Sequence, residues 1–351
     1  MKNAIEKIDK NLEIKTINNR DELTFYDACS EKFYISGLIH DTMFRRMPEK
    51  TAKAVSEGVY ALHTHTAGGS VHFETNSNRI AIKCTMNEIT HFPHMAATGV
   101  YGFDIYVNNE YFKTFVPPVD ITDGYESEVT LTGTEMRKIT INFPLYNNVT
   151  DLYIGLENGA ECKSINPYKP IKQVVFYGSS ITQGGCASRP GMSYQAIISR
   201  NIGCPVLNLG FSGSGNGERA MAEYISHLEM SIFVLDYDHN APNAEHLKNT
   251  HEPFFKIIRK SNPNLPIIML CQHDRFMSEA EERRRIIFET YTNAKNSGDN
   301  NVYFIDGFDL FPNRDCTVDG CHPTDYGFSF MAEKIGSVIE EILKNPTEKS
   351  A

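Results

Sequence analysis

Hydrophobic residues change their spacing partway along this chain, and that change restricts the folds open to it. From about residue 170 onward, short and uniformly apolar runs alternate with longer amphipathic stretches. Buried parallel strands connected by helices have this pattern, because helices cover both faces of such a sheet. We therefore predict a three-layer α/β/α domain over residues 161–351. Its strands are expected at 173–177, 206–209, 232–235, 267–270 and 302–305, and its longer helices at 244–259, 279–295 and 328–343.

The first half of the chain has a different period. Apolar and polar residues alternate over several short runs, which include 71–73, 80–84, 103–107, 129–131 and 139–143. A period of two predicts strands with one buried face, and several in succession indicate a sandwich. We predict a jelly-roll-like all-β sandwich domain over residues 1–160, and segment 158–170 is the expected passage into the second domain.

Two short segments carry the candidate chemistry. Ser180 lies in a glycine-flanked turn directly after the run 173–177, and Asp319 precedes His322 by three residues near the end of the chain. A serine hydroxyl becomes a nucleophile when a histidine takes its proton and a carboxylate fixes the histidine tautomer. Ser180, His322 and Asp319 are therefore a candidate triad for acyl transfer. A plain turn is the alternative for such a Gly-Ser-Ser tract.

Two further loops are expected beside Ser180. The strand at 206–209 runs into the glycine-rich segment 210–215, and the strand at 232–235 runs into 236–240. In an open α/β sheet, loops at the carboxyl ends of the strands form the ligand site. Glycine N–H groups and asparagine amides are the donor types that build an oxyanion hole.

With these blocks in this order, the C-terminal half resembles the SGNH hydrolases, also called GDSL esterases. The resemblance implies Ser180 as nucleophile, His322 as general base and Asp319 as its orienting acid. It further implies the N–H groups of Ser180 and Gly213 and the side chain of Asn240 as the oxyanion hole. Two positions depart from the family pattern. Ser179 replaces the usual aspartate before the nucleophile, and the third block lacks its glycine, which leaves Asn243 as the alternative to Asn240.

The N-terminal half also resembles a known domain. Residues 102–106, Gly-Phe-Asp-Ile-Tyr, are similar to the Gly-x-Asp-Leu-Tyr signature of a β-sandwich that precedes the hydrolase domain in one bacterial branch of the family. Residues 44–48 and 184–191 fit the same branch. That branch resembles carbohydrate esterases that remove acetyl groups from plant hemicelluloses, so this substrate class is implied by the resemblance.

The charge balance excludes some partners. A net charge of −10 and a pI near 5.7 disfavour nucleic acids and anionic membrane surfaces, because phosphate binding needs a basic surface. No apolar stretch is long enough to span a bilayer. The first residues are charged and lack the apolar segment of a signal peptide, so a cytoplasmic location is expected. The oligomeric state is left open, with a homodimer as one alternative.

No metal or organic cofactor is expected. The eight cysteines are scattered, and Cys316 and Cys321 lack a second close pair that would complete a tetrahedral site. The His63/His65 and His91/His94 pairs are interpreted as packing or surface residues. The chain has no tryptophan, so tyrosine and phenylalanine would have to stack on sugar rings. Tyr237, Tyr326, Phe92 and His94 are the predicted substrate-binding residues.

Three functional hypotheses follow. The leading one is a serine esterase that deacetylates hemicellulose-derived oligosaccharides of mannan or xylan through an acetyl-enzyme. The second keeps the chemistry but changes the substrate, to that of a lipase, a thioesterase or a general short-chain esterase. The third is a non-catalytic carbohydrate-binding protein that has kept the fold. The polar, glycine-rich loops at 212–219 and 236–245 favour a small acyl group on a polar alcohol over a lipid.

Overall fold

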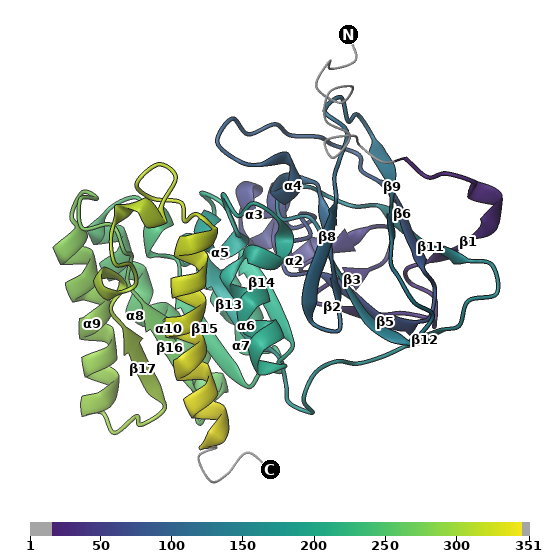
Figure 1. Ribbon diagram of the computed structural model, residues 1–351. Helices are drawn as coiled ribbons and strands as arrows, with labels where there is room; N and C mark the ends of the chain where they lie inside the picture. The colour runs from purple at the N-terminus through teal and green to yellow at the C-terminus, as the bar shows by residue number, and fades with distance from the viewer. Residues whose placement is uncertain (1–15, 346–351) are drawn as a thin grey trace.

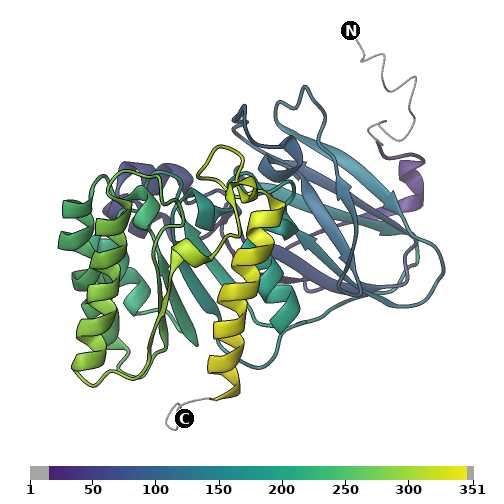
Figure 2. The ribbon, with the colours of Figure 1, turned by 60° about the vertical axis from the view of Figure 1, so that its left-hand side comes forward.

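A computed structural model describes residues 16–345 of the chain. Figure 1 shows two halves, an antiparallel β structure and a parallel α/β structure, which lie side by side in Figure 2 as well. The predicted combination of a β-sandwich with a parallel-sheet domain is confirmed. Within the described residues, no helix combines the length and apolarity that crossing a bilayer requires.

Two antiparallel sheets form the N-terminal half. The first sheet has the order β1 (Leu23–Asp27), β11 (Asp151–Glu157), β6 (Arg79–Thr85) and β9 (Gly124–Thr130). The second has the order β12 (Cys162–Ser164), β5 (Ser70–Thr75), β10 (Arg137–Asn142), β7 (Phe103–Val107) and β8 (Glu110–Phe115), with β2 (Tyr34–Ser36) also paired to β5. Side chains at alternate positions, such as Ile80 and Ile82 or Ile139 and Ile141, are fully buried, as the period of two predicts.

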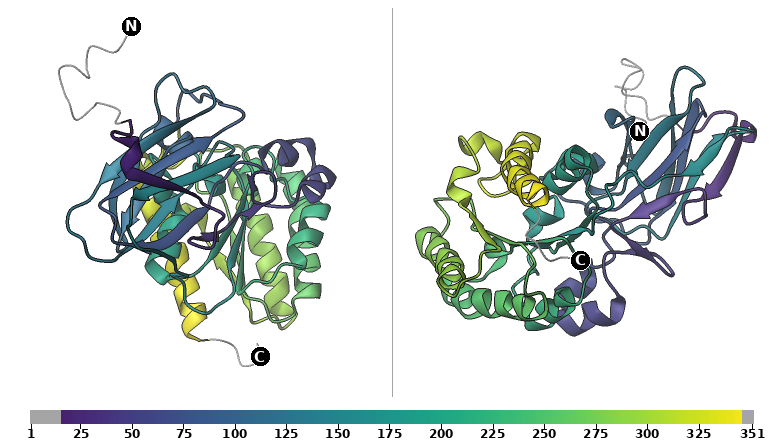
Figure 3. Two further views of the ribbon diagram at one scale, coloured as in Figure 1. Left: turned by 90° about the vertical axis from the view of Figure 1, so that its right-hand side faces the viewer. Right: turned by 90° about the horizontal axis from the view of Figure 1, so that it is seen from below.

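The parallel sheet of the C-terminal half has the order β14 (Val206–Gly210), β13 (Val174–Gly178), β15 (Ile232–Asp236), β16 (Ile267–Leu270) and β17 (Val302–Ile305). Helices α6 (Tyr194–Ile202) and α10 (Asp325–Lys344) cover one face, and α7 (Arg219–Ser226), α8 (Ala244–Ser261) and α9 (Ala280–Asn296) cover the other (Figure 3, right). Alternate side chains of β13 point to opposite faces of the sheet, so each face has its own core beneath its helices. Val174 and Phe176 join the core with α6 and α10, whereas Val175 and Tyr177 join the core with α7 and α8.

Short elements lie mainly in the connections between these strands and helices. They are η2 (Arg20–Glu22), β3 (Ile39–His40), β4 (Phe44–Arg45), α2 (Glu49–Val55), α3 (Glu57–Leu62), α4 (Ala97–Val100), α5 (Ser180–Gln183), η3 (Pro190–Met192), η4 (Asp238–Asn240), η5 (Gly307–Asp309) and η6 (Arg314–Cys316). The pair α2 and α3 precedes most of the sandwich in sequence but packs beside α7 (Figure 3). Ala52 and Val59 therefore share a core with Met221 of the parallel-sheet half.

The last strand of the antiparallel structure falls inside the expected passage 158–170. Strand β12 pairs with β5, so the antiparallel structure continues to Ser164, past the predicted end at residue 160. We place the division between Ser164 and Val174, where β13 begins.

A buried carboxylate joins the two halves. Asp104 of β7 accepts hydrogen bonds from Asn142 Nδ2 (2.7 Å), Arg189 Nη1 (2.9 Å) and the N–H of Gly191 (2.8 Å). A side chain at Gly191 would collide with Tyr106, so this position requires glycine. Burial raises the pKa of Asp104, and these three donors oppose that effect. The aspartate and tyrosine of the 102–106 motif thus hold the segment that follows the Ser180 turn.

We expect Asp104→Ala to lower the free energy of unfolding by about 3 kcal/mol or more, because it leaves the Gly191 N–H without its acceptor and the Arg189 guanidinium without its carboxylate. Denaturant unfolding at neutral pH measures this loss. Asp120→Ala, which changes an exposed aspartate of the same half, should stay within about 0.5 kcal/mol of the unmodified protein. Equal stability of the two variants would contradict a joint held by Asp104.

Candidate active site

Ser180 lies where β13 turns into the single-turn helix α5. Ser179 caps this helix, since its hydroxyl accepts a hydrogen bond from the N–H of Ile181 at 3.2 Å. Its own N–H donates to Thr182 Oγ1 at 3.2 Å. The position that departs from the family pattern therefore has a local structural role. Ser180 is the first helical residue, and only 8% of its surface is exposed.

Three side chains from the two ends of the domain form a hydrogen-bonded line. Ser180 Oγ lies 2.9 Å from His322 Nε2, and His322 Nδ1 lies 2.8 Å from Asp319 Oδ2. The other carboxylate oxygen of Asp319 accepts from the N–H groups of His322 (2.8 Å) and Cys321 (3.0 Å). The structure thus brings together the three residues predicted as a triad, with the spacing that such proton transfer requires.

The charge of Asp319 is held by its surroundings. Burial by itself raises the pKa of this carboxyl, but the hydrogen bonds from His322 and Cys321 outweigh burial and lower the pKa to about 2. Asp319 is therefore ionised at any working pH. An ionised Asp319 keeps the proton of the neutral imidazole on Nδ1 and leaves the lone pair of Nε2 facing the serine.

The predicted oxyanion donors lie on the two neighbouring loops. Gly213 follows β14 with φ +64°, in the left-handed region that favours glycine. Asn240 ends η4 after β15, and its Nδ2 donates to the carbonyl of Phe211 at 2.9 Å. That bond uses one amide hydrogen and anchors the group against the 211–213 segment, while the second hydrogen remains for another acceptor.

Asn243, the alternative to Asn240, has a different position. It is the exposed N-cap of α8, and its Oδ1 accepts from the N–H of His246 at 2.8 Å. Its amide oxygen caps the first turn of α8, and no contact of this side chain with the segment beside Ser180 is seen among the described residues. The geometry therefore favours Asn240.

Tyr237 cannot contact a substrate, so this prediction is wrong. Its side chain is 1% exposed and packs against Tyr177 and Phe254, and its hydroxyl lies 2.7 Å from Thr250 Oγ1. Since it continues directly from β15, it points into the helix-covered core. Tyr326 has the opposite environment. It is 55% exposed in the first turn of α10 and packs edge-on against Phe330.

Phe92 and His94 reach the triad from the sandwich half. The His94 ring lies 5.6 Å from the His322 ring, and Phe92 packs edge-on against Tyr146 at 5.3 Å. Tyr146 in turn donates to the carbonyl of Ser180 at 3.0 Å. The N-terminal half therefore lines the candidate site as well as supporting it. Tyr146 carried no sequence signal, because a buried tyrosine after a strand is usually a core residue.

Gln183 links several parts of the site and was also missed. Its Nε2 lies 3.0 Å from His65 Nδ1, and its Oε1 accepts from the N–H of Ser212 at 3.0 Å. These bonds fix the glycine-rich segment against α5. His65, considered above only as half of a histidine pair, is thus a partner of the site's scaffold.

Arg46 holds the start of the glycine-rich segment 210–215. The buried guanidinium donates to the carbonyls of Leu62, Asn208 and Gly210, and it packs over the Phe211 ring at 4.5 Å. Burial lowers its pKa below the ordinary value. A buried cation of this kind positions a loop through carbonyl oxygens, which gives residues 44–48 a physical role.

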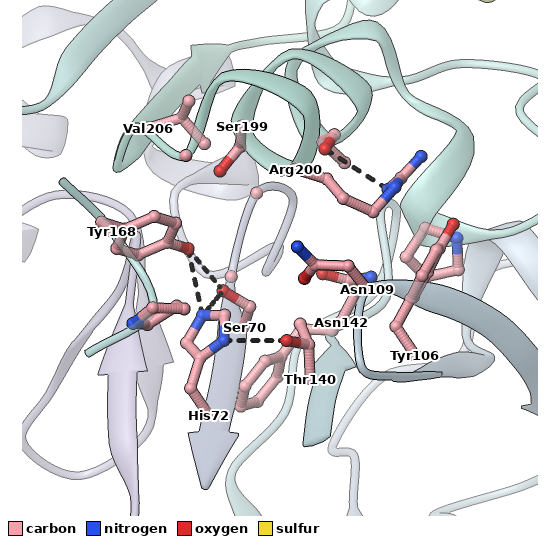
Figure 4. A pocket seen from close by; sticks show the side chains of 17 residues that line it. Ser70, His72, Tyr106, Asn109, Thr140, Asn142, Tyr168, Ser199, Arg200 and Val206 are labelled. Carbon is pink, nitrogen blue, oxygen red and sulfur yellow. Dashed lines mark hydrogen bonds between the residues drawn. The ribbon is translucent and has the colours of Figure 1, made fainter. Parts of the chain in front are cut away.

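A second serine–histidine pair lies elsewhere and lacks the features of the first. A cavity of about 60 Å³ lies at the junction of the halves, and Ser70 Oγ there lies 2.8 Å from His72 Nε2. The side chains that line it are drawn in Figure 4. The other ring nitrogen of His72 faces Thr140 Oγ1 at 3.0 Å, where a triad would have a carboxylate. Burial lowers the pKa of His72 to about 3, so this imidazole is a weak base. We interpret the pair as part of the domain junction.

Comparisons with known proteins agree with the two halves. Residues 171–340 match the model of the GDSL-like lipase/acylhydrolase family. Residues 23–162 match the GxDLY model, described as the N-terminus of Esterase_SGNH_hydro-type. No curated protein matches the chain.

Several solved structures share both halves. A GDSL-like lipase, so named, from Bacteroides ovatus ATCC 8483 is 29% identical with a TM-score of 0.82, over 92% of this chain and 98% of that chain. A salicylyl-acyltransferase from a tetracycline biosynthetic pathway is 18% identical with a TM-score of 0.76, over 93% and 98%. An acetyl xylan esterase from the rumen bacterium Butyrivibrio proteoclasticus is 13% identical with a TM-score of 0.58, over 92% and 99%. The last two show a common fold.

Proposed function

We propose a hydrolytic function for this chain, which belongs to the GDSL-like lipase/acylhydrolase family. It is a serine esterase that removes acetyl groups from hemicellulose-derived oligosaccharides of mannan or xylan. The observation that carries the proposal is the hydrogen-bonded line from Ser180 through His322 to Asp319 at the end of β13. A protein that only binds sugar has no need of that line, so the non-catalytic alternative is disfavoured.

The mechanism is a double displacement. Ser180 Oγ attacks the acetyl carbonyl while His322 Nε2 takes its proton, and Asp319 stabilises the imidazolium that forms. The N–H groups of Ser180 and Gly213 and the amide of Asn240 stabilise the oxyanion. His322 then protonates the sugar oxygen as it leaves. A water molecule, deprotonated by His322, attacks the acetyl-enzyme and releases acetate.

A hollow beside the loop that carries Asp319, although no triad residue lines it, supports a carbohydrate substrate over a lipid. A hollow of about 220 Å³ adjoins the loop of Asp319 through Thr317 and Gly320. Its lining mixes aromatic rings with charged and amide groups, a combination suited to the apolar faces and hydroxyls of a sugar. These lining residues include Phe276, Phe311, Arg275, Arg314 and Asn313.

We expect Asn240→Ala to lower kcat about a hundred- to a thousandfold, because one oxyanion donor is lost while the triad remains. Steady-state kinetics on an activated ester measure this. Asn243→Ala is the matched control, since it removes an amide three residues away that caps α8. It should lower stability by about 1 kcal/mol and leave kcat almost unchanged. The reverse ranking of the two kcat values would assign the oxyanion role to Asn243.

Acetate release from acetylated manno- and xylo-oligosaccharides tests the function. The assay includes Ser180→Ala as the inactive control, with 4-nitrophenyl acetate and a medium-chain ester alongside. Serine-dependent release from the oligosaccharides, far faster than from either small ester, supports the carbohydrate esterase and identifies its backbone. Preference for the medium-chain ester would replace it with a lipase or general esterase, and sugar binding without acetate release would leave a binding protein.

A further inference from the structure

Three side chains with metal-binding atoms meet beside the candidate triad. A nitrogen of His94, the sulfur of Cys186 and a nitrogen of His322 all lie within 4.8 Å of one another. They come from three distant parts of the chain, since His94 lies in the loop between β6 and β7, Cys186 follows α5, and His322 precedes α10. Two imidazoles and a thiol are typical ligands of Zn²⁺ and of other cations that prefer nitrogen and sulfur.

The backbone orients Cys186 toward the two histidines. Cys186 has φ +72°, a left-handed conformation that is uncommon for a residue with a side chain. Its Sγ–H points to the carbonyl oxygen of His94 at 3.5 Å. An ideal Cβ at the preceding Gly185 would lie 3.1 Å from His322 Cδ2, so the imidazole of His322 lies against the 185–186 segment.

The contact that orients His322 for proton transfer also orients it for metal binding. Asp319 occupies its Nδ1 at 2.8 Å, which leaves Nε2 as the available ligand atom. A carboxylate on the far nitrogen is the usual outer partner of a zinc-binding histidine, because it fixes the ring and raises its basicity. Zinc bonds of about 2.0–2.3 Å put tetrahedral ligand atoms about 3.5 Å apart. The three ligand atoms must therefore come closer than their present separations of up to 4.8 Å, and of the three residues His94 is the exposed one.

We propose that His94, Cys186 and His322 bind a thiophilic divalent cation, with Zn²⁺ as the reference ion, and that this cation inhibits the enzyme. Binding releases the Cys186 thiol proton to solvent and leaves one coordination position for water. The ion takes the Nε2 lone pair that Ser180 needs, so the general base is lost while the cation is bound. The site itself is independent of the proposed function; only the inhibition rests on it.

Isothermal titration of the full chain with Zn²⁺ tests the site directly. Ser180→Ala, inactive by design, should bind one Zn²⁺ per chain with an affinity close to that of the unmodified protein. Cys186→Ser should weaken binding at least about tenfold, since a thiolate ligand is lost. Titration with Co²⁺ should give the ultraviolet sulfur-to-metal charge-transfer band with Ser180→Ala and not with Cys186→Ser.

A second cysteine provides the matched control. Cys321 adjoins His322 in sequence, but its sulfur lies 3.6 Å from His239 Nδ1 and outside the cluster. Cys321→Ser should keep both zinc binding and inhibition. In esterase assays, zinc should inhibit the unmodified protein reversibly with a chelator, and Cys186→Ser should need at least about tenfold more zinc. Undiminished zinc affinity of Cys186→Ser, or lost binding in Cys321→Ser, would overturn the proposal. Absent esterase activity would refute only the proposed function, because binding by Ser180→Ala does not depend on turnover.

Discussion

Ser180→Ala should lower kcat by about 10⁵-fold or more while the protein stays folded. The hydroxyl oxygen is the only atom of the line that can form the acyl-enzyme, and alanine leaves nothing in its place within reach of His322 Nε2. The residual rate would come from the oxyanion donors acting on a water molecule. Single-turnover assays with 4-nitrophenyl acetate, monitored by mass spectrometry for the acetyl adduct, measure both the rate and the intermediate.

The control for this variant is the neighbouring serine. Ser179→Ala removes a hydroxyl that caps α5 and touches no triad residue, so it should cost about 1 kcal/mol of stability. Its kcat should fall far less than that of Ser180→Ala. Turnover by a correctly folded Ser180→Ala variant near that of the unmodified protein would eliminate the nucleophile assignment.

Asp319→Asn should lower kcat by about 10⁴-fold. The carboxylate accepts from His322 Nδ1 with one oxygen and from two backbone N–H groups with the other. An asparagine amide has only one oxygen, so its NH₂ group must face either His322 Nδ1 or the two backbone N–H groups. An uncharged partner also fails to stabilise the imidazolium. Because KM depends mainly on contacts outside this line, we expect the loss in kcat and not in KM.

Asp319→Asn should also change how the stability of the fold depends on pH. The folded-state pKa of Asp319, about 2, lies below its ordinary value of 3.8, so the ionised form stabilises the fold above pH 4. That contribution is lost as the pH falls through about 2. Denaturant unfolding between pH 5 and pH 2 should therefore show a steeper decline for the unmodified protein than for Asp319→Asn. Parallel declines would mean that the carboxylate is not held in its charged form.

Regular elements and local motifs were predictable because their causes are local. Short apolar runs such as 232–235 and 267–270 form β15 and β16, since such runs alternating with longer amphipathic stretches are typical of parallel strands buried on both faces. Asp319 and His322 are three residues apart, so one tight turn is enough to join them. The pairing of a β-sandwich with a parallel sheet followed from the change of period alone.

Side-chain directions in loops were not predictable, because distant segments decide them. Tyr237 follows its strand just as Asn240 does, yet α8 covers the first and leaves the second beside Phe211. The choice between Asn240 and Asn243 likewise depended on where α8 begins.

The sequence by itself determined the two fold classes, the order of the blocks and the residues that we propose for acyl transfer. Burial period and short-range hydrogen bonding, which set these features, are properties of contiguous residues. Only the tertiary structure decided that Asp104 docks the sandwich on the segment after Ser180, and that His94, Cys186 and His322 meet. Such contacts join residues far apart in the chain, and they exist only once both cores have packed and fixed the directions of the loops.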